Sequence, residues 1–216
     1  IPARGPLAAN TVPGAVAGWG AAYDYATAEM DSTLQWKELL EHAIRYAKEG
    51  FPVTASQAYW TKVNLDETDQ EFRALQRFEE FARVFLKDGK PYEEGELLKQ
   101  RDLGDTLAYI AQHGAQAFYN SELTEKIVQD SQAQGGLLTM EDFKAHTSDW
   151  VDPISVNYRE YTAYNLPPNT QGMASLSILN ILNHFDVSSI EEGSADYYHL
   201  LVEAIKYAFI DRDTYL

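Results

Sequence analysis

The segment that decides the fold is Leu166-Pro-Pro-Asn-Thr-Gln-Gly172, which runs directly into the apolar stretch 173–185. Because proline has no backbone N–H for a ladder hydrogen bond, the two prolines end the strand that precedes them. A glycine-containing turn then opens a helix, which we expect from Gly172 to about Phe185. Its apolar residues lie on nearly every side, so this helix should be buried.

The residues on either side of this segment predict a hairpin before it and a second buried helix after it. Ile154, Val156 and Tyr158 alternate with polar residues, and residues 161–166 are rich in β-formers. We expect a turn at Arg159-Glu160. The last helix should begin after Ser194 as its N-cap, and it is also apolar almost all round.

The first 150 residues are predicted to be mainly helical. Apolar residues at i, i+3 and i+4 spacing indicate helices over about 15–26, 36–47, 69–86, 102–112 and 121–133. The helix over 69–86 would bury a stripe made of Phe72, Leu75, Phe78, Phe81, Ala82 and Phe85. Thr139 with Asp142 is typical of a capping box that starts a further short helix, ending near His146.

These patterns together predict an α+β fold. We expect a mainly helical region over residues 1–150, and over 151–216 a hairpin with two buried helices, as parts of one domain. A chain of 216 residues, 45% hydrophobic, is long enough for a sizeable core.

Composition excludes several classes of function. The chain has no cysteine, which excludes a disulfide framework, a thiolate zinc site and a cysteine nucleophile within it. Its net charge of −16 repels nucleic acid and anionic membranes. No run approaches the roughly 20 apolar residues of a membrane span. The chain starts at Ile1 without a basic n-region, so we expect no signal peptide here and a longer parent gene product.

No motif of a serine hydrolase, zinc protease, P-loop or dinucleotide site is present. Metal-ligand spacing is not found among the five histidines, so we expect no metal site at His42, His113, His146, His184 or His199. The acidic pairs Glu79-Glu80 and Glu93-Glu94 are adjacent residues, which do not face each other on a helix, and a solvated face is expected rather than an acid–base dyad.

Three polar groups near the end of the chain each leave two interpretations open. Glu203 and Lys206, at i, i+3, predict a surface ion pair, with catalysis as the alternative. Asp211-Arg212 follows an apolar helix, so a structural ion pair is expected, with binding of a substrate carboxylate as the alternative. The polar residues 169–171 either cap the helix that follows or hold an anion.

Several short motifs occur in a fixed order along the chain. They are Thr11-Val-Pro-Gly-Ala-Val-Ala-Gly18, Ala43-Ile-Arg-Tyr-Ala-Lys-Glu-Gly-Phe51, Asp102-Leu-Gly-Asp-Thr-Leu107 with Gly114 and Phe118-Tyr119, Gly135-Gly-Leu-Leu-Thr-Met-Glu-Asp142, and the stretches 153–161 and 166–212. In this order the whole chain resembles the gamma-glutamyltransferase family, which includes cephalosporin and glutaryl acylases. The family's P-P-P-S-S-G-G is replaced by Pro167-Pro-Asn-Thr-Gln-Gly-Met173, and its usual glycine by Glu160.

The resemblance implies a parent protein with the αββα fold of N-terminal nucleophile hydrolases. Such a proenzyme cuts itself into a large and a small subunit, and the new N-terminal Thr of the small subunit attacks a gamma-glutamyl or related acyl amide, with its own amine as the base. This chain would be part of the large subunit. The arginine that grips the substrate carboxylate would precede Ile1, and the cleavage point would follow Leu216.

The resemblance therefore assigns no catalytic residue, no metal and no cofactor to this chain, and leaves its substrate-binding residues unknown. The implied partners are the small subunit and a small-molecule amide substrate. A periplasmic or secreted location is favoured by the family, with the cytoplasm as the alternative. Three other functions remain open: a divergent cephalosporin acylase-like member, a relative that has lost its nucleophile, and a non-catalytic helical module whose aromatic side chains dock a partner.

Overall fold

The computed structural model describes residues 6–8, 11–69 and 73–216. The chain divides into two compact units, residues 1–148 and 149–216. The expected division between residues 150 and 151 lies two residues from this boundary. The described residues form many helices and three small antiparallel sheets, which confirms the α+β class.

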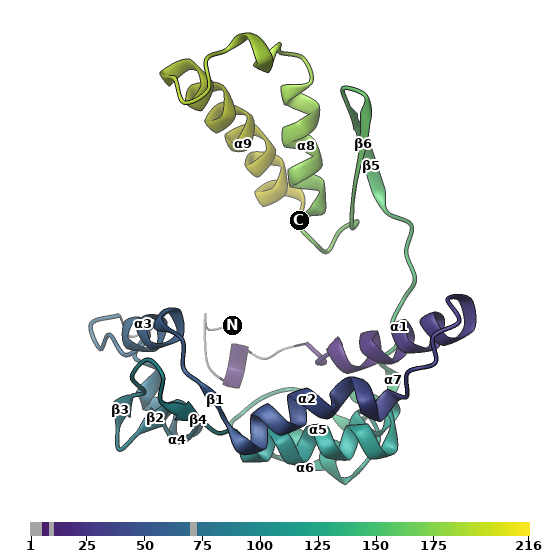
Figure 1. Cartoon of the computed structure of the whole chain (residues 1–216), viewed down its shortest axis with the longest axis vertical. Coiled ribbons are helices and arrows are strands. Elements are labelled where there is room, and N and C mark those ends of the chain that lie inside the picture. Colours follow the sequence, from purple (N-terminus) through teal and green to yellow (C-terminus); the bar gives the residue numbers. More distant parts are fainter. Residues whose placement is uncertain (1–5, 9–10, 70–72) are drawn as a thin grey trace. The chain divides into compact units, whose positions relative to one another are not determined.

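The first unit is mainly helical (Figure 1). Its α-helices are α1 (Ala15–Glu29), α2 (Trp36–Glu49), α3 (Ala55–Val63), α4 (Glu79–Phe85), α5 (Arg101–His113), α6 (Glu122–Ala133) and α7 (Met140–Ala145). Its short strands pair as β1 (Phe51–Pro52) with β4 (Leu97–Leu98), and β2 (Leu86–Lys87) with β3 (Lys90–Pro91).

Helices α2 and α5 lie side by side and form the centre of this unit (Figure 1). They approach closely because α5 has a glycine where α2 presents Ala47 and Lys48: a Cβ at Gly104 would lie 2.5 Å from Lys48 Cγ. The core beside this contact draws on α1, α2, α5, α6 and α7. Its buried residues are Val16, Ala17, Leu40, Ile110, Tyr119, Val128, Leu138 and Phe143.

The predicted ends of several helices are confirmed. Gly50 ends α2 with φ +99, a conformation that side chains rarely adopt, and its N–H bonds to Tyr46 O. The predicted capping box starts α7, because Thr139 Oγ1 accepts from Asp142 N–H while the Asp142 carboxylate accepts from Thr139 N–H. Helix α1 runs to Glu29, three residues beyond the prediction.

The prediction of one helix over 69–86 is wrong. A short 3-10 turn over Leu75–Arg77 and the helix α4 are separated by Phe78, whose backbone is extended (φ −93, ψ 115). Leu75 N–H bonds to Asn64 O at the end of α3, so a contact between segments replaces a bond within the expected helix. Part of the expected stripe, Phe72, lies outside the described residues.

Helix α3 was missed by the sequence reasoning. It begins at Thr54, whose Oγ1 accepts from Gln57 N–H (3.1 Å). None of its residues is buried, so it lacks the apolar stripe that periodicity detects.

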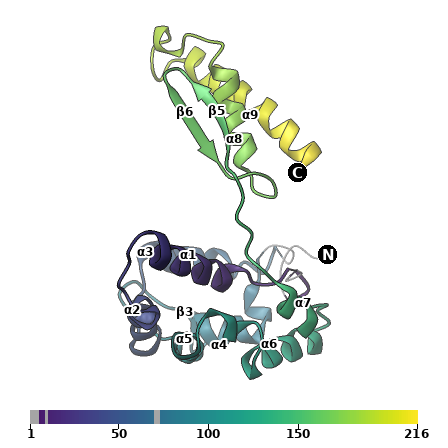
Figure 2. The same ribbon diagram turned by 90° about the vertical axis from the view of Figure 1, so that its right-hand side faces the viewer.

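The second unit contains a hairpin and two long helices (Figures 1 and 2). The predicted hairpin is confirmed as β5 (Ile154–Tyr158) paired antiparallel with β6 (Tyr161–Asn165), with Tyr158 opposite Tyr161. Helix α8 (Gly172–Leu182) contacts both the hairpin and α9 (Ala195–Tyr215). Only Ser175 and Asn180 of α8 are exposed, so its predicted burial is largely confirmed, although it ends three residues before Phe185.

Helix α9 begins at its predicted N-cap and packs on α8 through one stripe. Ser194 Oγ accepts from Tyr197 N–H (3.2 Å). The stripe that faces inward contains Ala204 and Ala208, which are 2% and 1% exposed. Small side chains at these positions let the two helices approach closely. Within the described residues, no helix combines the length and the apolar character that crossing a membrane requires.

Candidate functional site

The turn between β6 and α8 carries the polar residues that the sequence left open between capping and anion binding. Thr170 Oγ1 accepts from Gly172 N–H (3.2 Å) and lies 3.1 Å from Pro167 O. A Cβ at Gly172 would collide with Leu166 O, so only glycine fits the start of the helix. The Thr170 hydroxyl therefore closes the turn onto the first N–H of α8, whereas the N-cap residue, Gln171, makes no side-chain cap hydrogen bond.

Arg212 connects the end of α9 to the same turn. Its Nη1 donates to Gln171 Oε1 (3.0 Å), a contact across 41 residues, and its Nε donates to Asp213 Oδ1 (2.8 Å). The guanidinium carbon also lies 3.9 Å from the centre of the Phe209 ring. The predicted structural ion pair is therefore present, with Asp213 as the carboxylate, and the donors Nε and Nη1 are directed to groups of the protein itself.

Glu203 and Lys206 form the predicted pair on the surface of α9. Lys206 Nζ lies 2.7 Å from Glu203 Oε1. This hydrogen bond lowers the pKa of the Glu203 carboxyl and raises the pKa of Lys206, which keeps both groups charged. An i, i+3 pair of this kind supports the helix only weakly.

The other titratable candidates are the five histidines and the two acidic pairs. Within the described ranges, no group of three or more His, Asp or Glu side chains is placed to hold a metal ion. Glu80 pairs with Arg83 (2.6 Å) on α4. Glu93-Glu94 was expected to lie on a helix, but this pair precedes β4 in a turn, where the glycine at position 95 has φ +83.

Tyr119 joins two of the sequence motifs, and the sequence reasoning gave it no role. Its hydroxyl donates to Pro13 O (2.7 Å) and accepts from Ala17 N–H (2.9 Å). Gly14, the residue that precedes α1, has no side chain to cap the helix. Tyr119 therefore supplies the missing partner across about 100 residues, and the His146 ring stacks on it at 5.2 Å.

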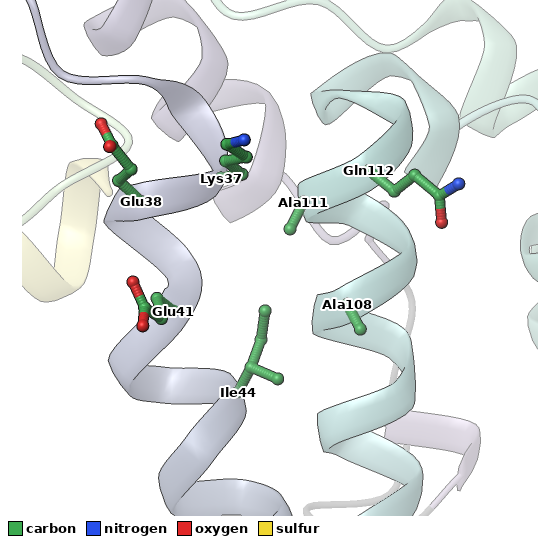
Figure 3. A pocket seen from close by; sticks show the side chains of 7 residues that line it. All are labelled: Lys37, Glu38, Glu41, Ile44, Ala108, Ala111 and Gln112. Carbon is green, nitrogen blue, oxygen red and sulfur yellow. The ribbon is translucent and has the colours of Figure 1, made fainter.

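A groove lies between α2 and α5 (Figure 3). Its volume is about 620 Å³, and Ile44, Ala108 and Ala111 form its apolar floor. Charged and polar side chains from both helices line its rim. One of them, Glu38, already accepts from Gln35 N–H (2.7 Å) as part of the cap of α2. The groove is open and offers little that would bind and orient a substrate.

A long exposed apolar stripe runs along α9. Tyr198, Val202, Ile205 and Phe209 follow one another at i, i+4, i+7 and i+11, one residue on from the stripe that packs against α8. Their side chains are 59%, 52%, 38% and 37% exposed. A helix that is apolar on nearly all sides is normally buried. The sequence predicted a buried helix here, but in α9 only Ala204 and Ala208 are buried, and this stripe is exposed.

Comparison with known proteins gives a consistent result along the whole chain. The family described as gamma-glutamyltranspeptidase matches residues 1–216. The glutathione hydrolase-like YwrD proenzyme of Bacillus subtilis is 42% identical over all of this chain, which spans 39% of that proenzyme. The chain thus covers about two fifths of this curated relative.

Two solved structures have the same fold as this chain. The gamma-glutamyltranspeptidase of Helicobacter pylori is 30% identical, with a TM-score of 0.83 over 99% of this chain and 58% of its own. The cephalosporin acylase of Bacillus halodurans is 34% identical, with a TM-score of 0.83 over 98% of this chain and 38% of its own.

Proposed function

Because the chain belongs to the gamma-glutamyltranspeptidase family, we propose that it is a large-subunit segment of a self-processing amidase or acyltransferase. The proposed substrates are gamma-glutamyl or related acyl amides. The observation that carries the proposal is the likeness to solved gamma-glutamyltranspeptidase and acylase structures over 98–99% of this chain. In the parent αββα fold, residues 1–150 would form the mainly helical region. Residues 151–216, which contain the hairpin and the two long helices, would be part of the αββα core.

The proposed chemistry uses a hydroxyl from a separate polypeptide. The N-terminal Thr of the small subunit would attack the amide carbonyl carbon, and its free amine would take the hydroxyl proton and pass it to the leaving amine. The resulting ester would then be cleaved by water or by the amine of an acceptor. This chain would provide the scaffold and no reacting group.

The titration behaviour of this chain supports a scaffold role. Among the residues that the structure describes, four carboxyl groups have a lowered pKa: Asp66, Glu96, Asp142 and Glu203. In each case the largest cause is a hydrogen bond from a nearby side chain, namely Thr68, Lys87, Thr139 and Lys206. All four are explained by caps or surface pairs, whereas catalytic acids and bases usually have a pKa moved toward neutrality.

The test is to express the full-length gene product and to determine the mass and N-terminal residue of every polypeptide, together with hydrolysis of a gamma-glutamyl anilide. We expect two polypeptides, one of which starts with Thr, and release of the aniline. A single uncut polypeptide that does not hydrolyse the anilide would contradict the proposal. That result is the one expected of a relative that has lost its nucleophile, or of a non-catalytic module.

A second candidate is a cephalosporin acylase-like specificity within the same family. It is favoured by the turn Pro167-Pro-Asn-Thr-Gln-Gly172, which departs from the family's serine-containing pattern. A comparison of glutaryl and gamma-glutamyl amides of the same aniline decides between the two. A higher kcat/KM for the glutaryl amide would support the acylase.

A further inference from the structure

We propose that a pocket of the first unit, lined by α1, the start of α2 and the end of α7, binds a small aromatic carboxylate. Its volume is about 660 Å³, which lies within the range of about 300–1,000 Å³ for small-molecule sites. All of the residues that line it belong to the first unit. The inference goes beyond the proposed function and does not depend on it, since it assigns no reacting group.

One side of this pocket is formed by mostly small residues of α1. They are Ala17, Gly20, Ala21 and Asp24. Their spacing of three and four residues places them on the same face of the helix. A Cβ at Gly20 would lie 2.8 Å from Ala115 Cβ, so only glycine fits there without a shift. Ala17 and Asp24 are about 10 Å apart along the helix axis at 1.5 Å per residue, so the pocket is long enough to have two distinct ends.

The end of the pocket beside Asp24 is aromatic. The rings of Tyr23 and Trp36, which both line the pocket, meet edge to face with their centres 5.5 Å apart. Trp36 Nε1 donates to Ile110 O (2.9 Å), which fixes the orientation of the indole ring. Because contacts within the protein already hold these rings in place, a flat apolar group can bind against them at little cost in ordering.

The opposite end, near Ala17, offers hydrogen-bond donors. The His146 ring stacks on Tyr119, whose hydroxyl accepts from Ala17 N–H. His146 Nε2 is buried without a hydrogen-bond partner, so we place the proton of the neutral ring on Nδ1. Lys144 lines the same pocket, and within the described residues its ammonium takes part in no ion pair. An unpaired ammonium and an imidazole N–H at one end of a pocket suit a carboxylate.

The charges of the pocket fix the orientation of the ligand. Asp24 lies at the aromatic end, where its carboxylate repels an anion. The donor end is roughly 10 Å away, which is about the Debye length at 0.1 M salt, so this repulsion is largely screened there. The carboxylate of the ligand is therefore favoured at the Lys144 end, with the aromatic part toward Trp36.

The experiment measures the binding of phenylbutyrate to the full-length gene product by isothermal titration calorimetry, with phenylbutanol as the uncharged counterpart. We expect phenylbutyrate to bind about tenfold more tightly, because hydrogen bonds to charged groups are stronger than neutral ones. Lys144→Met should remove this difference. The matched control is Lys126→Met, which removes an exposed charge of α6 outside the pocket and should preserve the difference.

A second pair of variants tests the place of binding without changing any charge. Ala21→Leu adds a side chain inside the pocket and should abolish binding of phenylbutyrate. Ala22→Leu adds the same side chain at an exposed neighbouring position of α1 outside the pocket and should leave the affinity unchanged. Absence of phenylbutyrate binding at millimolar concentration would overturn the inference. Binding that is the same in Lys144→Met and Ala21→Leu as in the unchanged protein would also overturn it.

Discussion

Replacing Tyr119 by Phe removes one oxygen atom and should measurably weaken the first unit. Tyr119 is 2% exposed, and its hydroxyl makes two hydrogen bonds, to Pro13 O and from Ala17 N–H. The substitution leaves the ring in place, so it creates almost no cavity. It removes both partners of the start of α1, where Gly14 offers no side-chain cap.

The magnitude follows from these two bonds. A neutral hydrogen bond contributes about 0.5–1.5 kcal/mol, and a buried group left without a partner costs about 1–3 kcal/mol. Ala17 is 8% exposed, so water reaches its N–H poorly after the change. We expect the Tyr119→Phe variant to lose about 2–3 kcal/mol of unfolding free energy.

The assay is urea unfolding of the purified protein, combined with hydrogen exchange at the Ala17 amide. The matched control is Tyr109→Phe, since the Tyr109 ring lies 4.5 Å from the His113 ring and Phe keeps this ring contact, so the change should cost little. Exchange at Ala17 should become faster in the Tyr119 variant alone. Equal stability of the two variants, with unchanged exchange at Ala17, would refute the assigned role of the hydroxyl.

Four further outcomes are expected from local features. Gly172→Ala should destabilise the second unit by about 1–3 kcal/mol through the clash with Leu166 O, whereas Gly18→Ala, which meets nothing within 4 Å in α1, should stabilise the protein by up to about 1 kcal/mol; thermal unfolding of both variants gives the two signs. Ser194→Ala should lower the free energy of unfolding by about 1 kcal/mol, because α9 loses its side-chain cap. Urea unfolding followed by circular dichroism measures this loss, and an unchanged unfolding midpoint would contradict it. Burial raises the pKa of Tyr119, so the contribution of its neutral hydroxyl to the free energy of unfolding is present below pH about 10 and is lost as pH rises through the folded-state pKa. In Tyr119→Phe, the free energy of unfolding should therefore fall less between about pH 9 and 11 than in the unchanged protein.

The helices and the hairpin could be predicted where the signal is local. Gly50, Thr139 and Ser194 mark helix ends through their own backbone or side-chain preferences, and these ends are found where the sequence placed them. Alternation of apolar residues over 154–158 similarly identified the hairpin. Capping and periodicity depend on neighbours within one or two turns, which is why one sequence is sufficient to read them.

The failures occur where a distant contact overrides the local pattern. The apolar spacing over 69–86 fits a helix, but Leu75 N–H bonds to Asn64 O and Phe78 is extended. The hydrogen bond from Arg212 to Gln171 spans 41 residues, and that from Tyr119 to Pro13 spans 106. Neither pairing has a signature in the spacing of residues, because it depends on how the chain returns on itself.

In the proposed enzyme, this chain supports a reaction carried out by a hydroxyl of another polypeptide. Trapping the acyl-enzyme tests this division of roles: the full-length protein is quenched in acid during turnover of a gamma-glutamyl substrate, and the added acyl mass is located by peptide mapping. We expect the acyl group on the N-terminal Thr of the small subunit. An acyl group attached to any residue within 1–216 would contradict it.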